Sequence, residues 1–142
     1  MLRQLLLGGL VSLGNIAIHA VVMTTVVDAA RKAWMWERRR PQLWLSAVMV
    51  AAVAVLLGAH VVEVTTWALT YWMFGVAPPD TDVLYFAFVN YTTLGYGDVV
   101  PVERWHLLGP ITAMNGVLLF GWSTAVIFEV MRRTVRLPDG RA

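Results

Sequence analysis

The sequence contains no cysteine, which excludes a disulfide, a thiolate metal site and a cysteine nucleophile. Charged residues are also scarce: they make up 14% of the chain, whereas about a quarter of a soluble domain is charged. Hydrophobic residues take their place and account for 58% of the chain. This balance excludes an ordinary soluble protein and indicates a protein embedded in a membrane.

Three uncharged apolar runs explain the excess, and they cover residues 5–27, 43–62 and 107–128. Each run reaches the ~20 residues that a helix needs to cross about 30 Å of hydrocarbon. No linker, internal repeat or low-complexity tract separates them. We therefore predict an all-α membrane protein, with three transmembrane helices in a single domain of residues 1–142.

Basic residues gather in two places, and the positive-inside rule assigns such segments to the cytoplasm. The loop 28–41 and the C-terminus are then cytoplasmic, while the N-terminus and the connection 75–106 lie outside. A basic loop also suits nucleic acid, but its position between two spans favours topology, so we expect a multi-pass cell-membrane protein without a nucleic-acid partner. Trp67 and Trp72 fit an aromatic belt at the outer interface. The basic residues are Arg31, Lys32, Arg38, Arg39 and Arg40 in the loop, and Arg132, Arg133, Arg136 and Arg141 after the third run.

Turn residues set the boundaries of the predicted elements. Pro41 suits the first turn of a helix, and Gly75 followed by two prolines ends that helix. Asp80 or Thr81 is expected to cap a short helix that cannot span the bilayer. The predicted segments are an additional N-terminal helix (1–30), a second helix (42–74), a short helix with an irregular loop (81–98) and a third long helix (105–132).

The irregular loop reads TTLGYGD from Thr92 to Asp98. Irregular backbone at membrane depth is stable only where protein buries it or where it lines water. The short helix before it would direct the partial negative charge of its C-terminus into the membrane, which favours a cation. Gly95 and Gly97, at alternate positions, permit a backbone that turns its carbonyls one way, and the Thr93 hydroxyl adds one more oxygen. The sequence therefore predicts a re-entrant pore helix and a pore loop.

TTLGYGD resembles the selectivity filter of potassium channels, in which the usual core is T-V-G-Y-G-D. Leu94 stands where valine is commoner, and the resemblance extends over residues 43–131. It implies a small prokaryotic channel of the inner membrane that conducts K⁺ passively, with no enzymatic activity, soluble substrate or cofactor apart from the permeant ion. Four loops must surround one ion, so it also implies a homotetramer in the lipid bilayer. The filter residues it implies are Thr93, Leu94, Gly95, Tyr96 and Gly97, with K⁺ bound at the first four.

The chain departs from the usual family pattern in three ways. Many relatives carry two tryptophans in the pore helix, where this chain has Tyr85 and Phe86. Some bacterial relatives pair a glutamate with the aspartate at the filter mouth, but that position is Val89 here. We therefore predict that the Tyr85 hydroxyl donates to Asp98, and that both residues, with Thr92, support the filter. The additional first helix is the third departure, and its lack of an Arg/Lys repeat argues against a voltage sensor.

Glycines in the spans allow two interpretations each. Gly116 and Gly121 lie near the positions of hinge glycines in relatives, so they are candidates for a gating bend. The third helix (105–132) is expected to be the inner, cavity-lining helix, after the second as the outer helix, and the alternative for both glycines is close packing between inner helices. Gly8, Gly9 and Gly14 either give the first helix a thin face for packing or reflect the higher glycine content of membrane helices.

Ionisable residues inside a span are costly, so they are candidate functional sites. His60 and Glu63 share a helix face at i, i+3. They form a structural pair, a pH-sensitive contact behind the pore helix, or a metal or catalytic site joined by His106. Asn15 and His19 are expected to form hydrogen bonds between helices, with that pair within reach.

Two classes of function remain. The first is a potassium-selective channel. The alternative is a non-conducting or weakly selective membrane subunit or sensor whose pore loop is structural. An intramembrane enzyme is less consistent with the sequence, because no nucleophile and base come together apart from His60 and Glu63.

Overall fold

The computed structural model describes residues 1–33 and 41–135, with side chains to residue 132. In this part of the chain every regular element is helical, which confirms the predicted all-α fold. Several basic residues behind the predicted orientation lie outside the described residues, namely Arg38, Arg39, Arg40, Arg136 and Arg141. The elements are α1 (Leu2–Ala33), α2 (Pro41–Phe74), α3 (Val83–Tyr91), the 3₁₀ turn η1 (Glu103–Trp105) and α4 (Leu108–Val135).

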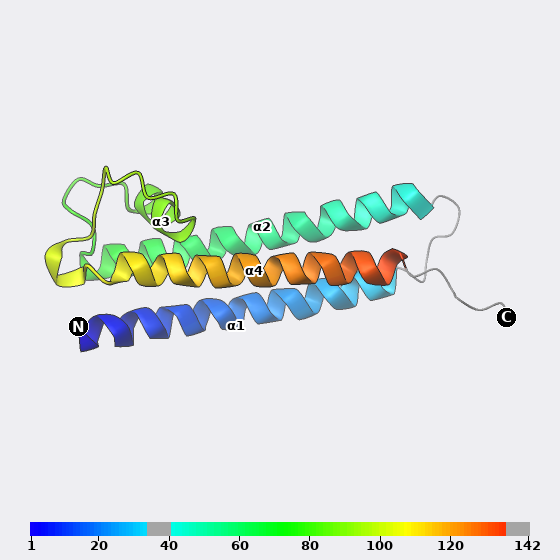
Figure 1. The fold of residues 1–142 in the computed structure, drawn as a ribbon, viewed down its shortest axis with the longest axis horizontal. Coiled ribbons are helices and arrows are strands. Elements are labelled where there is room, and N and C mark those ends of the chain that lie inside the picture. Colours follow the sequence, from blue (N-terminus) through cyan, green and yellow to red (C-terminus); the bar gives the residue numbers. More distant parts are fainter. Residues whose placement is uncertain (34–40, 136–142) are drawn as a thin grey trace.

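Three long helices, α1, α2 and α4, form an elongated bundle, and the short α3 lies at the end where α1 begins and α2 ends (Figure 1). All three long helices pack against one another. Each is long and apolar enough to cross a membrane. The three predicted spans are therefore confirmed as helices, and α3 is too short to be a fourth.

The additional helix α1 packs through a narrow stripe rather than through a broad apolar face. Gly8 lies so close to α4 that a Cβ atom on it would approach Ile111 to 2.9 Å. Nothing lies within 4 Å of a Cβ built on Gly9 or Gly14, so close packing explains only the first of the three glycines. The buried positions of α1 recur at helical spacing and include three polar residues; they are Gln4, Gly8, Asn15, His19, Met23 and Val26.

The turn into α3 differs from the prediction by one or two residues. The N-cap is Asp82, whose carboxylate accepts the backbone N–H groups of Leu84 and Tyr85 at 3.0 and 3.1 Å. Asp80 instead adopts a φ of 62°, in the left-handed region that aspartate tolerates in turns. Either aspartate could cap by composition, and the backbone of the turn decides which one does.

The connection from the loop to α4 is tied to the end of α2. The N–H of Val102 donates to the Val76 carbonyl at 2.9 Å, and the Trp105 indole N–H donates to the Phe74 carbonyl at 3.0 Å. The chain then makes the turn η1 before α4 begins at Leu108, three residues after the expected start. These contacts hold the last part of the 75–107 connection beside its first part, at the end of α2.

Trp67 is the main error in the predicted environment of the side chains. Its side chain is fully buried, and its indole N–H donates to Asn115 Oδ1 of α4 at 3.0 Å. Asn15 of α1 donates to the same oxygen at 3.2 Å. Trp72 lies on a different face of α2, is 70% exposed and fits the predicted interface position. Trp67 therefore belongs to the polar contacts that join the three long helices and not to an aromatic belt.

Candidate functional site

The loop after α3 is held by the last turn of that helix. The backbone N–H groups of Thr92, Thr93 and Leu94 bond back to carbonyls of α3 at 2.9, 3.1 and 3.0 Å. In a trans peptide the carbonyl points away from the N–H, so the carbonyls of Thr92 and Thr93 face away from α3. The accepting carbonyls belong to Phe88, Asn90 and Val89, respectively.

The loop backbone alternates in handedness. Thr93, Gly95 and Gly97 have φ values of 60°, 57° and 79°, whereas Leu94 and Tyr96 between them do not adopt positive φ. A positive φ is easy for glycine but costs free energy at a β-branched residue such as threonine. Such strain persists only when the surrounding structure fixes it, and it concentrates at functional sites. A backbone that alternates in this way can turn successive carbonyls toward one side, whereas those of a regular β-strand point to alternate sides.

The outer side of this loop is not covered by its own chain. Leu94 is 53% exposed and Tyr96 is 68% exposed. A hollow of about 370 Å³ lies beside the loop, between α3 and the first turns of α4. Its lining includes Asn90, Thr93, Gly95, Gly97, Pro101 and Pro110. These two side chains therefore do not pack into the bundle of their own chain.

The far end of the loop returns to α3 through one side-chain contact. The Tyr85 hydroxyl donates to Asp98 Oδ2 at 2.8 Å, which is the hydrogen bond predicted from the sequence. This bond, together with partial desolvation and the charge of the carboxylate, raises the pKa of Tyr85. The phenol therefore remains a proton donor throughout the neutral pH range. Val89, at the position of the missing glutamate, is buried.

The two candidate hinge glycines of α4 lie in different surroundings. A Cβ on Gly116 would lie 2.0 Å from the Tyr91 carbonyl oxygen, so this glycine lets α4 touch the end of α3. Nothing lies within 4 Å of a Cβ on Gly121. The helix runs unbroken through both positions. Gly116 thus has a packing role, although its contact is with α3 and not with another inner helix, and a hinge role stays a prediction for both glycines.

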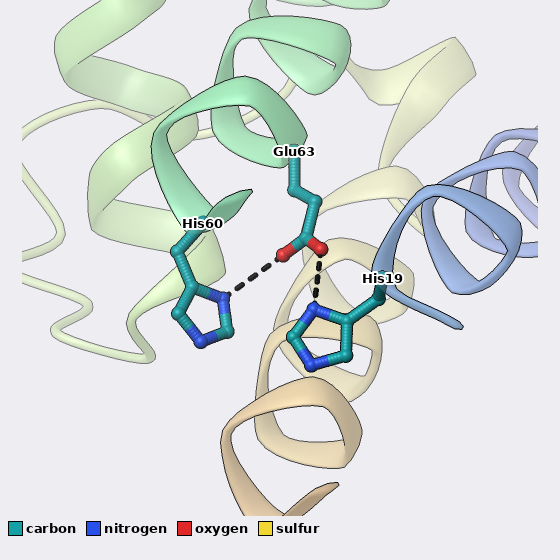
Figure 2. Close-up of side chains that lie close together, drawn as sticks. All are labelled: His19, His60 and Glu63. Atoms are coloured by element: carbon teal, nitrogen blue, oxygen red, sulfur yellow. Dashed lines mark hydrogen bonds and ion pairs between the residues drawn. The ribbon is translucent and has the colours of Figure 1, made fainter. Parts of the chain in front are cut away.

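His60 and Glu63 form the predicted contact, with His60 Nδ1 2.9 Å from Glu63 Oε2. His19 of α1 joins them at 2.6 Å from the other carboxylate oxygen (Figure 2). His106 does not join them, because it is exposed at the C-cap of η1. The prediction that His106 is the third member is therefore wrong, and the structure brings His19 to the pair instead.

Sequence reasoning missed two members of this cluster. The Tyr91 hydroxyl donates to Glu63 Oε2 at 2.5 Å, and Ser123 Oγ lies 2.9 Å from His60 Nε2. A tyrosine at the end of an aromatic-rich helix and a serine in an apolar run carry no distinctive spacing. One available signal was that Asn115 and Ser123 lie eight positions apart on one face of α4, toward which the polar residues of α1 also turn.

Comparisons with known proteins agree with this geometry. A family model described as "Ion channel" matches residues 43–133, more than half of the chain, from the start of α2 to near the end of α4. Neither the curated proteins nor the solved structures contain a match. The matched region includes α3 and the loop, and it leaves out α1.

Proposed function

The chain belongs to the ion channel family, and on that premise we propose that it conducts potassium ions passively through a filter of backbone carbonyls. The observation that carries the proposal is the alternating φ at Thr93, Gly95 and Gly97. A potassium filter replaces the hydration shell of the ion with rings of carbonyl oxygens. A backbone of alternating handedness supplies such a row of oxygens from consecutive residues.

The assignment of single ion sites follows from this backbone. The carbonyls of Thr93, Leu94, Gly95 and Tyr96 would bind K⁺, with the Thr93 hydroxyl below them and Gly97 at the outer end. The C-terminus of α3 ends at the base of the loop, where its partial negative charge favours a cation. Thr92 supports this base, because its hydroxyl donates to the Phe88 carbonyl at 2.7 Å.

Assembly as a homotetramer is part of the proposal. One loop offers oxygens on one side of an ion only, and a single pore loop per chain gives four identical chains as the simplest closed ring. The exposure of Leu94 and Tyr96 supports this, because neighbouring subunits would cover both side chains. The Tyr96 ring would then brace each filter strand against the next.

The proposed orientation places the loop on the outer side of a prokaryotic inner membrane. The basic residues between α1 and α2 support it, because they favour a cytoplasmic position. Arg31 and Lys32 lie in the last turn of α1, where their charge also suits the helix C-terminus. The N-terminus is then outside and the C-terminus cytoplasmic.

Replacing Gly95 tests the filter. A Cβ on Gly95 has room, since the nearest atom would be the Thr93 carbonyl oxygen at 3.9 Å. The effect of Gly95→Ala is therefore conformational, and a left-handed conformation costs an L-residue about 1–2 kcal/mol per chain. In liposomes with the purified protein, Gly95→Ala should abolish K⁺ flux or remove its preference over Na⁺. Gly14→Ala, whose Cβ meets nothing within 4 Å, is the matched control and should conduct as the wild type does.

Two results would count against the proposal. Unchanged K⁺ over Na⁺ preference in Gly95→Ala would show that the loop is not the filter. A wild-type protein that assembles but carries no ion flux would support the alternative, a non-conducting membrane subunit.

A further inference from the structure

A closed ring of polar side chains lies in the middle of the bundle, where four helices meet. His19 comes from α1, His60 and Glu63 from α2, Tyr91 from the last position of α3, and Ser123 from α4. All of these side chains except that of Ser123 are titratable, and they are the titratable groups that face one another here. Three of these, His19, Glu63 and Tyr91, are fully buried, and the His60 side chain is 12% exposed. Ionisable groups at this depth are expensive, so they require an explanation beyond packing.

Four contacts join Glu63, the two histidines and Ser123. The Tyr91 hydroxyl lies 3.0 Å from His60 Nδ1, but it donates its own hydrogen to Glu63 Oε2, so it supplies none to these four. On one side, His19 Nδ1 and His60 Nδ1 lie 2.6 and 2.9 Å from the two oxygens of Glu63, and Figure 2 shows both imidazoles turned toward this carboxylate. On the other side, both Nε2 atoms lie near Ser123 Oγ, at 3.2 Å for His19 and 2.9 Å for His60. All four distances are those of hydrogen bonds.

Counting hydrogens gives the protonation of the ring. Each of the four contacts needs one hydrogen, and the Ser123 hydroxyl brings one. The two histidines and Glu63 must therefore hold three between them. Free in water above about pH 7, an ionised carboxylate and two neutral imidazoles hold two. The count does not depend on where the third proton sits, because a histidinium with a carboxylate and two neutral imidazoles with a carboxylic acid both close the ring.

Charge favours the same state. With three protons the ring has no net charge. With two protons it carries one negative charge in the low-dielectric interior, and one imidazole lone pair faces the Ser123 oxygen at about 3 Å without a hydrogen between them. With four protons it carries one positive charge. Three protons therefore satisfy both the contacts and the charge.

A divalent cation is the other occupant to consider, because the ligand atoms of His19, His60 and Glu63 lie within 4.8 Å of one another. Ligands bound to one tetrahedral zinc at about 2.0–2.1 Å are separated by about 3.3 Å. The carboxylate oxygens and imidazole nitrogens are closer than that, at 2.6 and 2.9 Å. The observed distances are those of shared hydrogens.

We propose that this ring is a proton-binding site that couples pH to the loop after α3. Tyr91 carries the coupling, because its hydroxyl is bonded to Glu63 and its carbonyl rests against Gly116. The next two residues begin the loop. The extra proton belongs to the assembled ring, so its stabilising effect is complete at low pH and is lost as pH rises past the point of its release. Alkaline pH therefore loosens the base of the loop.

The melting temperature of the full-length protein in detergent tests proton binding without any assumption about conduction. For the wild type it should fall by several degrees between about pH 6 and about pH 9. In Glu63→Gln the amide donates to one imidazole and accepts from the other, as a protonated carboxyl would, so the ring closes without the extra proton. This variant should lose most of the pH dependence and be the more stable form at alkaline pH.

Controls separate the proposal from a plain structural role. Thr124→Ala removes a neighbouring hydroxyl of α4 that bonds to the Phe120 carbonyl, and it should keep the wild-type pH dependence. Ser123→Ala removes the bridge that requires the third proton, so it should weaken the pH dependence even if it lowers stability. A flat wild-type profile, or Glu63→Gln that is destabilised equally at every pH, would overturn the proposal. So would a melting temperature that rises with added Zn²⁺ in the wild type but not in Glu63→Gln, because the ring would then be a metal site.

The effect on the pore rests on the proposed function and is measured separately. Potassium flux through wild-type liposomes should decrease as pH rises over the same range, while Glu63→Gln should keep its flux. Equal pH dependence of flux in both proteins would refute the coupling. Absence of flux in both would refute the proposed function and leave the melting experiment to decide on proton binding.

Discussion

The hydroxyl of Tyr85 joins the far end of the loop 92–98 to α3, the helix from which that loop starts. Tyr85 lies in the first turn of α3, whereas Asp98 follows the last glycine of the loop. Their hydrogen bond of 2.8 Å therefore joins the two ends of the segment that contains residues 92–97. Some relatives use a glutamate for this purpose, and the buried Val89 leaves the task to a phenol.

Removing this hydroxyl should make the loop 92–98 less stable without preventing assembly of the protein. We expect Tyr85→Phe to assemble and to stay selective for K⁺, but to lose current faster during sustained opening, because Asp98 no longer has its donor. Asp98→Asn should show a related defect. Since both changes remove one contact, their effects should be non-additive in a double-mutant cycle of current decay. Independent, additive effects would contradict a direct role of the bond.

Helix α4 touches α3 at Gly116, and this glycine allows the two helices to lie in contact. The contact sets how near the end of α3 and the start of the loop lie to α4. A glycine near a family hinge position invites a gating interpretation, yet the 2.0 Å approach of a built Cβ to the Tyr91 carbonyl already requires glycine there. A packing role and a hinge role of Gly116 predict different results for the substitution Gly116→Ala.

Gly116→Ala should destabilise the fold, because the added methyl group must push α3 away from α4. Overpacking of this kind typically costs about 1–3 kcal/mol. The melting temperature should fall and K⁺ flux should decrease with it. Gly121→Ala, in open space within the chain, is the control and should change neither much. An unchanged melting temperature with altered channel opening in Gly116→Ala would favour the hinge instead.

The elements were predictable where one segment carries its own signal. Run length and hydropathy define three spans, and the two prolines after Gly75 mark the end of α2. Contacts between elements were less predictable. Trp67 was placed at the interface by its position near the end of a span, but its partner is Asn115, 48 residues away.

In the candidate site, too, local features were predictable and contacts between distant segments were not. The loop was found from seven consecutive residues, and the Tyr85–Asp98 bond from a missing partner at Val89. The proton-binding ring was visible only in part, as the pair His60 and Glu63 with His19 within reach. Its other members come from three different helices, and no local spacing reveals that Tyr91 and Ser123 meet them. Side chains that become neighbours only through packing of four helices require the structure.

At the scale of the whole molecule, the loop after α3 has one side that its own chain leaves open, with Tyr96 68% exposed. Four copies around an axis would cover that side and enclose the ion. Helix α1 lies outside the region that matches the family, so it is an addition to the pore unit that packs on both α2 and α4. Through His19 it also contributes to the proton-binding ring.

The reversal potential of the reconstituted wild-type channel, with K⁺ on one side of a bilayer and Na⁺ on the other, tests the central claim most directly. If the carbonyls of residues 93–96 form a potassium filter, the reversal potential should lie far from zero, with the side that contains K⁺ negative. A reversal potential near zero, with equal passage of both ions, would contradict the account.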